Sequence, residues 1–132
     1  MRVWRSVAAV LLWGLQILMG AGFIAIGIGK FQDPSWVQRF ARWGYPDGFY
    51  MVVGVLECAG AIILLVPRLA SYGAALIGAI MIGAAATHAV HGEMARLPPT
   101  LFFLVMMTVI GVGRWSRAAR PSSRRVQAAH PV

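Results

Sequence analysis

The stretch that decides the fold is Ser6–Gly29, SVAAVLLWGLQILMGAGFIAIGIG, which contains no Asp, Glu, Lys or Arg. A helix that crosses a bilayer needs about 20 apolar residues, within a range of about 17–25. Arg2 and Arg5 precede the stretch, as basic residues precede the core of a signal peptide, but the stretch is longer than the core of about 7–15 residues of such a peptide. We therefore predict a membrane-spanning helix that is retained.

Three further stretches have almost no charged residues, and the single exception is Glu57. Their apolar residues run continuously instead of alternating, which excludes a membrane β-barrel. Backbone groups in hydrocarbon must bond within their own segment, so each stretch is expected to be helical. The connections are short, which favours antiparallel neighbours. The sequence predicts an all-α, four-helix transmembrane bundle as one domain, residues 1–114, with spans at about 6–29, 48–66, 70–91 and 98–114.

Composition agrees with a chain whose main partner is the lipid bilayer. Of 132 residues, 59% are hydrophobic and 12% charged, against about 45–50% and about 25% in soluble domains. The single cysteine, Cys58, excludes an internal disulfide and a redox-active cysteine pair. The net charge of +8 does not indicate nucleic-acid binding, because no aromatic residue that could stack on bases follows Trp115.

The distribution of basic residues predicts the orientation. More of them fall on the side of the termini than on the other side, and the side richer in Lys and Arg is cytoplasmic. We therefore expect a multi-pass protein of the inner membrane with both termini in the cytoplasm. The basic tail, residues 115–132, is expected to be disordered and to lie against anionic headgroups. The two groups are Arg2, Arg5, Arg68, Arg114, Arg117, Arg120, Arg124 and Arg125, against Lys30, Arg39, Arg42 and Arg96.

The connection between the first two spans predicts a short amphipathic helix. Asp33 and Pro34 are typical of a helix start, and Trp36, Phe40 and Trp43 then recur at helical spacing. Such a stripe is typical of a helix in the membrane interface. We favour a lipid-surface anchor, and the alternative is a lid over the mouth of the bundle.

Small residues recur at every fourth position of the third span: Ala75, Ala79, Gly83 and Thr87. Such a stripe lets two helices approach closely. We predict that it forms a packing seam inside the bundle and not a dimer face, although a homo-oligomer stays open.

Glu57 is the most informative polar residue, because it lies near the middle of the second span. A central Asp, Lys or Arg costs about 2.5–3.5 kcal/mol of insertion free energy, so an ionisable residue at that depth is a candidate functional site. The partners within reach are Lys30 and His88. Thr87 and His91 belong to the same half of the bundle, so the sequence predicts a polar cluster there.

Two interpretations of this cluster stay open. Glu57 either fixes the helix register, or it takes part in proton transfer or in binding a quinone or small solute. His88, His91 and Glu93 have spacing that a metal site could use, but the signal is weak and no metal site is predicted. The catalytic residues, if there are any, are unknown.

Five sequence elements, taken together and in their order along the chain, resemble the DoxX-like family of small membrane proteins. The resemblance implies a four-helix membrane bundle and suggests Lys30, Glu57 and His88 as motif positions. Cys58 departs from the family, where a small apolar residue is expected. The elements are GKF at 29–31, FARWGYP at 40–46, GVLECAGA at 54–61, LVPR at 65–68, and MIGA at 81–84 followed by Thr87 and His88.

The family takes its name from a subunit of a thiosulfate:quinone oxidoreductase. The resemblance therefore implies a membrane subunit or accessory of a redox or stress-response system, with redox proteins as partners and quinone as the candidate cofactor. Independent catalysis is not expected, because the chain has no redox cysteine pair. The alternatives are a small-solute or proton-coupled transport protein and a purely structural scaffold.

Overall fold

The computed structural model describes residues 1–120, and this part of the chain contains helices and no strand. The predicted all-α class is therefore confirmed for these residues. The predicted tail falls mostly on residues 121–132, which lie outside the described residues. The elements are α1 (Arg2–Gln32), α2 (Ser35–Arg42), α3 (Phe49–Leu65), α4 (Ala70–Val90), the 3-10 helix η1 (Met94–Arg96) and α5 (Leu97–Ala118).

Three of these segments are long and apolar enough to cross a membrane: Arg2–Gln32, Ala70–Val90 and Met94–Ala118. The fourth, α3, is apolar but has only 17 residues. The last helix continues four residues beyond the predicted boundary at 114, so the start of the predicted tail is helical. Arg117 lies in its last turn, where a positive charge interacts favourably with the helix dipole.

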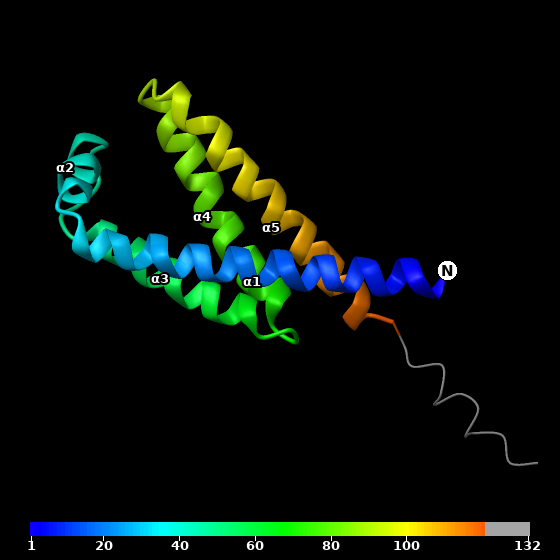
Figure 1. Cartoon of the computed structure of the whole chain (residues 1–132). Helices are drawn as coiled ribbons and strands as arrows, with labels where there is room; N and C mark the ends of the chain where they lie inside the picture. The colour runs from blue at the N-terminus through cyan, green and yellow to red at the C-terminus, as the bar shows by residue number, and fades with distance from the viewer. Residues whose placement is uncertain (121–132) are drawn as a thin grey trace, which may run out of the picture.

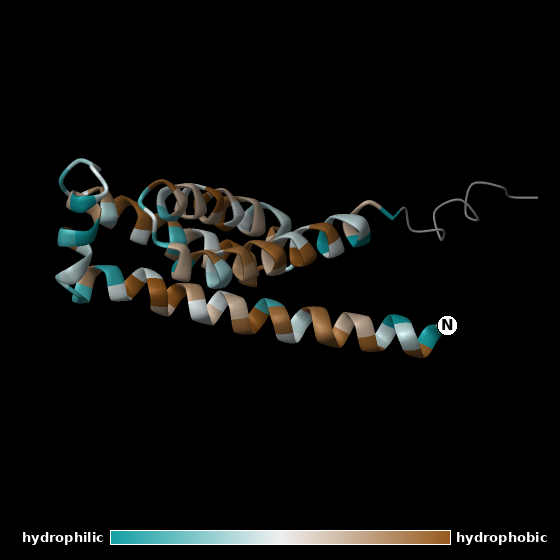
Figure 2. Ribbon diagram, turned by 90° about the horizontal axis from the view of Figure 1, so that it is seen from above, coloured by the Kyte–Doolittle hydropathy of each residue, from teal (hydrophilic) through white to brown (hydrophobic). Residues whose placement is uncertain are grey.

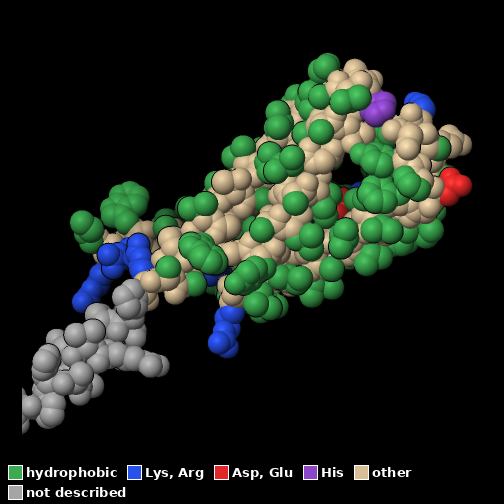
Figure 3. Space-filling view, turned by 180° about the vertical axis from the view of Figure 1, so that it is seen from behind, with side chains coloured by type: hydrophobic (Ala, Val, Ile, Leu, Met, Phe, Trp, Pro, Cys, Tyr) green, Lys and Arg blue, Asp and Glu red, His purple; other side chains and the backbone are tan. Residues whose placement is uncertain are grey.

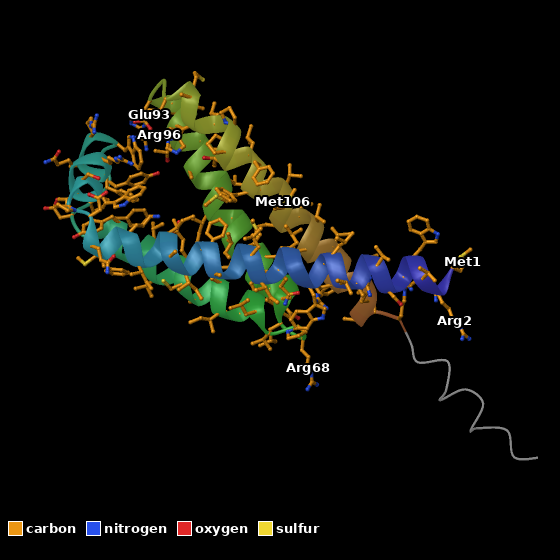
Figure 4. The ribbon with its side chains drawn as sticks, viewed as in Figure 1. Met1, Arg2, Arg68, Glu93, Arg96 and Met106 are labelled. Atoms are coloured by element: carbon orange, nitrogen blue, oxygen red, sulfur yellow. The ribbon has the colours of Figure 1, made fainter. Side chains whose placement is uncertain are left out.

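The long helices form two hairpins that meet at one end and diverge at the other. The first hairpin is α1 with α3, and the second is α4 with α5, while α3 and α4 join them. Figure 1 shows α4 and α5 rising away from α1 and α3, with α2 across the wide end. We call this wide end the α2 end. The opposite end, where Arg68 is labelled in Figure 4, is the Arg68 end.

Glycine permits the close approach of α3 and α4 near the Arg68 end. A Cβ atom at Gly73 would lie 2.6 Å from the carbonyl oxygen of Gly60. The predicted seam of small residues on α4 is therefore wrong, since Ala75 and Ala79 are exposed and a Cβ at Gly83 would meet nothing within 4 Å. The seam lies on a neighbouring face of the same helix, because α3 packs against that face instead.

Buried apolar side chains from all four long helices form one core. Many large hydrophobic side chains remain exposed on the outer surfaces of the same helices, and the colouring of the ribbon in Figure 2 shows hydrophobic residues along most of their length. Such a surface suits a lipid environment, and the chain has the features of a membrane protein. The core consists of Leu12, Met19, Phe23, Ala61, Leu64, Ala74, Ile77, Met81, Met107 and Ile110.

A buried glutamine connects the two hairpins by hydrogen bonds near the Arg68 end. Gln16 is fully buried, and its Nε2 donates a hydrogen bond to the carbonyl oxygen of Leu64 at 2.6 Å. Arg114 Nε donates to Gln16 Oε1 at 2.7 Å. These contacts link α1, α3 and α5 at one end and leave the other end free to diverge.

Candidate functional site

A cavity of about 420 Å³ lies between the two hairpins at the α2 end. The space-filling view from behind shows this region hollowed between the arm that ends in the loop after α4 and the end that carries α2, with charged side chains visible inside (Figure 3). Polar side chains and aromatic rings share its wall. They include Lys30, Glu57, Thr87, His88 and Arg96, with Phe23, Trp36, Phe40, Trp43, Tyr45, Phe49 and Phe103.

A buried ion pair is the centre of the site. Lys30 Nζ donates a hydrogen bond to Glu57 Oε2 at 2.7 Å, and the two side chains are 5% and 3% exposed. The same ammonium lies 4.4 Å from the ring centroid of Trp36, within cation–π range. Of the two partners predicted for Glu57, the structure therefore has Lys30.

Close packing of α1 against α3 brings this pair together. Gly54 lies one turn before Glu57 on α3, and a Cβ atom there would be 3.3 Å from the Cβ of Lys30 and 3.1 Å from the carbonyl oxygen of Gly27. Because neither glycine has a side chain, the last turn of α1 lies directly against the middle of α3. The lysine side chain then reaches the carboxylate within the cavity.

His88 has a different partner from the one considered in the sequence. Its Nδ1 lies 2.8 Å from Glu93 Oε2, while Glu93 Oε1 accepts a hydrogen bond from Trp43 Nε1 at 3.3 Å. Arg96 Nε is 3.6 Å from the same carboxylate. Glu93 and Arg96 lie between the tip of the second hairpin and α2 in Figure 4. Glu93 therefore links α2 to the α4–α5 hairpin.

This arrangement sets the ionisation of Glu93. Partial burial acts to raise the pKa of its carboxyl group, but the hydrogen bonds from His88 and Trp43 and the charge of Arg96 together lower that pKa below its usual 4.5. The carboxylate is consequently the form that holds these contacts.

The two other residues of the predicted cluster, Thr87 and His91, take different positions from each other. Tyr45 and Thr87 share a hydrogen bond of 2.6 Å between their hydroxyl oxygens, and both line the cavity. His91 is exposed and does not line it, because its Nδ1 lies 2.7 Å from the carbonyl oxygen of Thr87. Within residues 1–120 no three potential ligands among His, Cys, Asp and Glu converge on a metal position.

The aromatic stripe of α2 faces the protein and not the lipid. Phe40 is 6% exposed, and Trp36 and Trp43 line the cavity with it. The favoured prediction of a lipid-surface anchor is therefore wrong for this stripe, and the lid alternative describes it. The reason is that the rings find partners inside, namely the Lys30 ammonium for Trp36 and the Glu93 carboxylate for Trp43.

Three residues with structural roles were not predicted from the sequence: two of them, Tyr45 and Glu93, lie at the α2 end, and Gln16 lies near the Arg68 end. Glu93 was considered only as a weak metal ligand, Tyr45 only as part of the FARWGYP element, and Gln16 not at all. A glutamine inside an otherwise apolar span is a signal that could have been used, since polar side chains at that depth bond between helices. Glu93 offered no comparable signal, because its position in a loop is ordinary for a carboxylate.

Comparison with known proteins gives one match. The model of the DoxX-like family matches residues 14–110, which include Lys30, Glu57 and His88. No curated protein and no solved structure matches the chain.

Proposed function

Because this chain belongs to the DoxX-like family, we propose that it is a four-span inner-membrane protein that binds a quinone or quinol beside Lys30 and Glu57. In this role it serves as a membrane subunit or accessory of a redox or stress-response system. The observation that carries the proposal is the buried ion pair in the wall of a cavity with aromatic surroundings.

The ion pair offers a hydrogen-bond donor for the carbonyl oxygen of a quinone and an acceptor for the hydroxyl group of a quinol. Lysine has three donors, and one is directed at Glu57. A remaining donor can bond to a quinone carbonyl oxygen. Glu57 Oε1 has no recorded partner within residues 1–120, so it can accept a hydrogen bond from a quinol hydroxyl. Both oxidation states of the ring therefore have a partner at the same place.

The surroundings favour an uncharged ligand. The opposite charges of Lys30 and Glu57 cancel, and so do those of Arg96 and Glu93 at the α2 end. The remaining wall is mostly aromatic and aliphatic. Ligand pockets commonly measure about 300–1,000 Å³ and combine an apolar wall with a few polar groups, and the cavity of about 420 Å³ fits a single ring system.

Four spans and an inner-membrane location complete the proposal. α3 is apolar and lies between α1 and α4, and its 17 residues are at the lower end of the spanning range of about 17–25. Arg68 and the basic residues near both termini then lie on the cytoplasmic side. With Cys58 as the only cysteine, electrons for the ring come from a partner protein.

Quantification of bound quinone tests this function. Protein purified in mild detergent is extracted with organic solvent, and the quinone per protein molecule is measured by mass spectrometry. The wild type should carry quinone, and Glu57→Gln should carry several-fold less. Asp47→Asn is the matched control, because Asp47 is exposed in a loop and its neutralisation should leave the content unchanged. A wild type that neither carries quinone nor binds added quinone refutes the proposal.

A further inference from the structure

Two aromatic rings meet on the side of the cavity between α1 and α5. Phe23 and Phe103 meet edge to face, with ring centroids 5.2 Å apart. Phe23 is 1% exposed, so its ring has no free surface toward the outside. The two rings narrow this side, although Ile26, which also lines the cavity, is 36% exposed.

The α2 end is closed by the segment that contains α2. Trp43 is bonded to Glu93 and Tyr45 to Thr87, so two contacts join this segment to the second hairpin. The ring of Phe40 lies between those of Trp43 and Tyr45, at 5.2 and 5.5 Å. These contacts hold the segment across this end of the cavity.

The side between α3 and α4 is open. Leu56 lines the cavity and is nevertheless 39% exposed. Gly83 also lines the cavity, is exposed, and has no atom within 4 Å of the position of a Cβ. Ile80, one turn before Gly83 on α4, also lines the cavity and is half-buried. The two helices separate here because their glycine contact is closer to the Arg68 end. The hollow in Figure 3 lies beside the α4 arm.

We infer that the ligand reaches the site sideways from the bilayer, through a window between α3 and α4 whose rim is Leu56, Ile80 and Gly83. This inference rests on the proposed function and adds the route by which the ligand enters. Leu56 is near the middle of α3, so in a spanning helix the window opens into hydrocarbon. A molecule dissolved in lipid meets it directly, whereas a water-soluble solute would first have to leave water.

Stopped-flow fluorescence can test the window. Changing Trp4, Trp13 and Trp115 to Phe leaves Trp36 and Trp43, both in the cavity wall, as the only tryptophans of the chain. Protein in lipid vesicles is mixed with vesicles that contain decylubiquinone. The rate at which the fluorescence falls reports access to the cavity, and its final level reports binding at equilibrium.

Gly83→Leu places a bulky side chain at the window, where a Cβ atom has nothing within 4 Å, and replaces a helical glycine by a better helix former. We expect it to slow quenching about tenfold, which corresponds to an added barrier of about 1.4 kcal/mol. Gly22→Leu is the matched control, since Gly22 is exposed on α1 with nothing within 4 Å of a Cβ. It should quench at the unaltered rate. Leu56→Ala widens the window and should quench faster.

The outcomes separate the two proposals. If decylubiquinone quenches neither the parent nor any variant at equilibrium, the proposed function fails. If quenching reaches its normal level but Gly83→Leu and Leu56→Ala both proceed at the rate of Gly22→Leu, the window is refuted and the binding site stands. Opposite changes in rate for the two window variants support the lateral route.

Discussion

Loss of Lys30 is expected to destabilise the fold more than loss of an ordinary surface charge. Lys30 Nζ is 2.7 Å from Glu57 Oε2, and both side chains are almost fully buried. Removing one partner of a buried ion pair leaves the other without compensation and costs about 3–5 kcal/mol. Lys30→Met also removes the cation–π contact with Trp36, which contributes about 0.5–2 kcal/mol.

The double variant separates the pair from these other effects. Replacing both members of a buried pair by apolar residues is often neutral or stabilising, so Lys30→Met with Glu57→Leu should be more stable than Lys30→Met alone. Unfolding by sodium dodecyl sulfate in mixed micelles, followed by circular dichroism, gives the four free energies of the cycle. We expect an interaction energy of about 2 kcal/mol, within the range of about 0.5–3 kcal/mol for residues in contact.

His88 provides the control for this cycle. Its recorded partner is Glu93 and not Glu57, so Glu57→Leu and His88→Leu should add within about 0.5 kcal/mol. Additive losses for Lys30 with Glu57 would refute the ion pair as an energetic unit. Coupling of Glu57 to His88 of similar size would show that the carboxylate is shared.

Three other predictions follow from the structure. Reporter domains fused after Arg68 and after Arg96 should report the cytoplasm and the opposite side, and the reverse pattern would refute the orientation. Gly73→Ala should destabilise by about 1–3 kcal/mol in micelle unfolding, because its Cβ would overlap the backbone of α3; Gly22→Ala, with free space around it, should be neutral or stabilising. Since the pKa of Glu93 is lowered in the fold, its contacts should be complete above pH 4.5 and weaken as the pH falls further. In the variant that retains only Trp36 and Trp43, the tryptophan emission should therefore change in acid, and Glu93→Gln should abolish that change.

The sequence was sufficient for the helical class and for two candidate partners of Glu57, Lys30 and His88, but not for the choice between them. Long uncharged stretches leave the backbone no alternative to helix in hydrocarbon, and the structure has the helices Phe49–Leu65 and Ala70–Val90 in two of these stretches. Lys30 was a candidate partner of Glu57 because few ionisable groups occur at reachable depth. The depth of a residue in the membrane can be counted along its predicted helix, and this count made Lys30 a candidate partner of Glu57.

Features that depend on helix rotation could not be predicted in the same way. The α4 helix has small residues on more than one face, so the stripe of Ala75 and Ala79 was as plausible a seam as the face of Gly73. The direction of the α2 stripe depended equally on tertiary partners. Rings suited to the interface also suit a cavity wall, and only the positions of Lys30 and Glu93 in space decide between them.

The position of the ion pair bears on whether Glu57 is structural or functional. A pair needed only to hold helix register could be replaced by apolar residues with little loss of stability. The hairpins already have a polar fastening near the Arg68 end, through Gln16 and Arg114. At the α2 end the hairpins diverge, and the pair lies in the wall of the resulting cavity instead of closing it. A scaffold gains nothing from an open cavity with charged groups, whereas a binding site requires both, so this arrangement favours a ligand-binding role for Glu57.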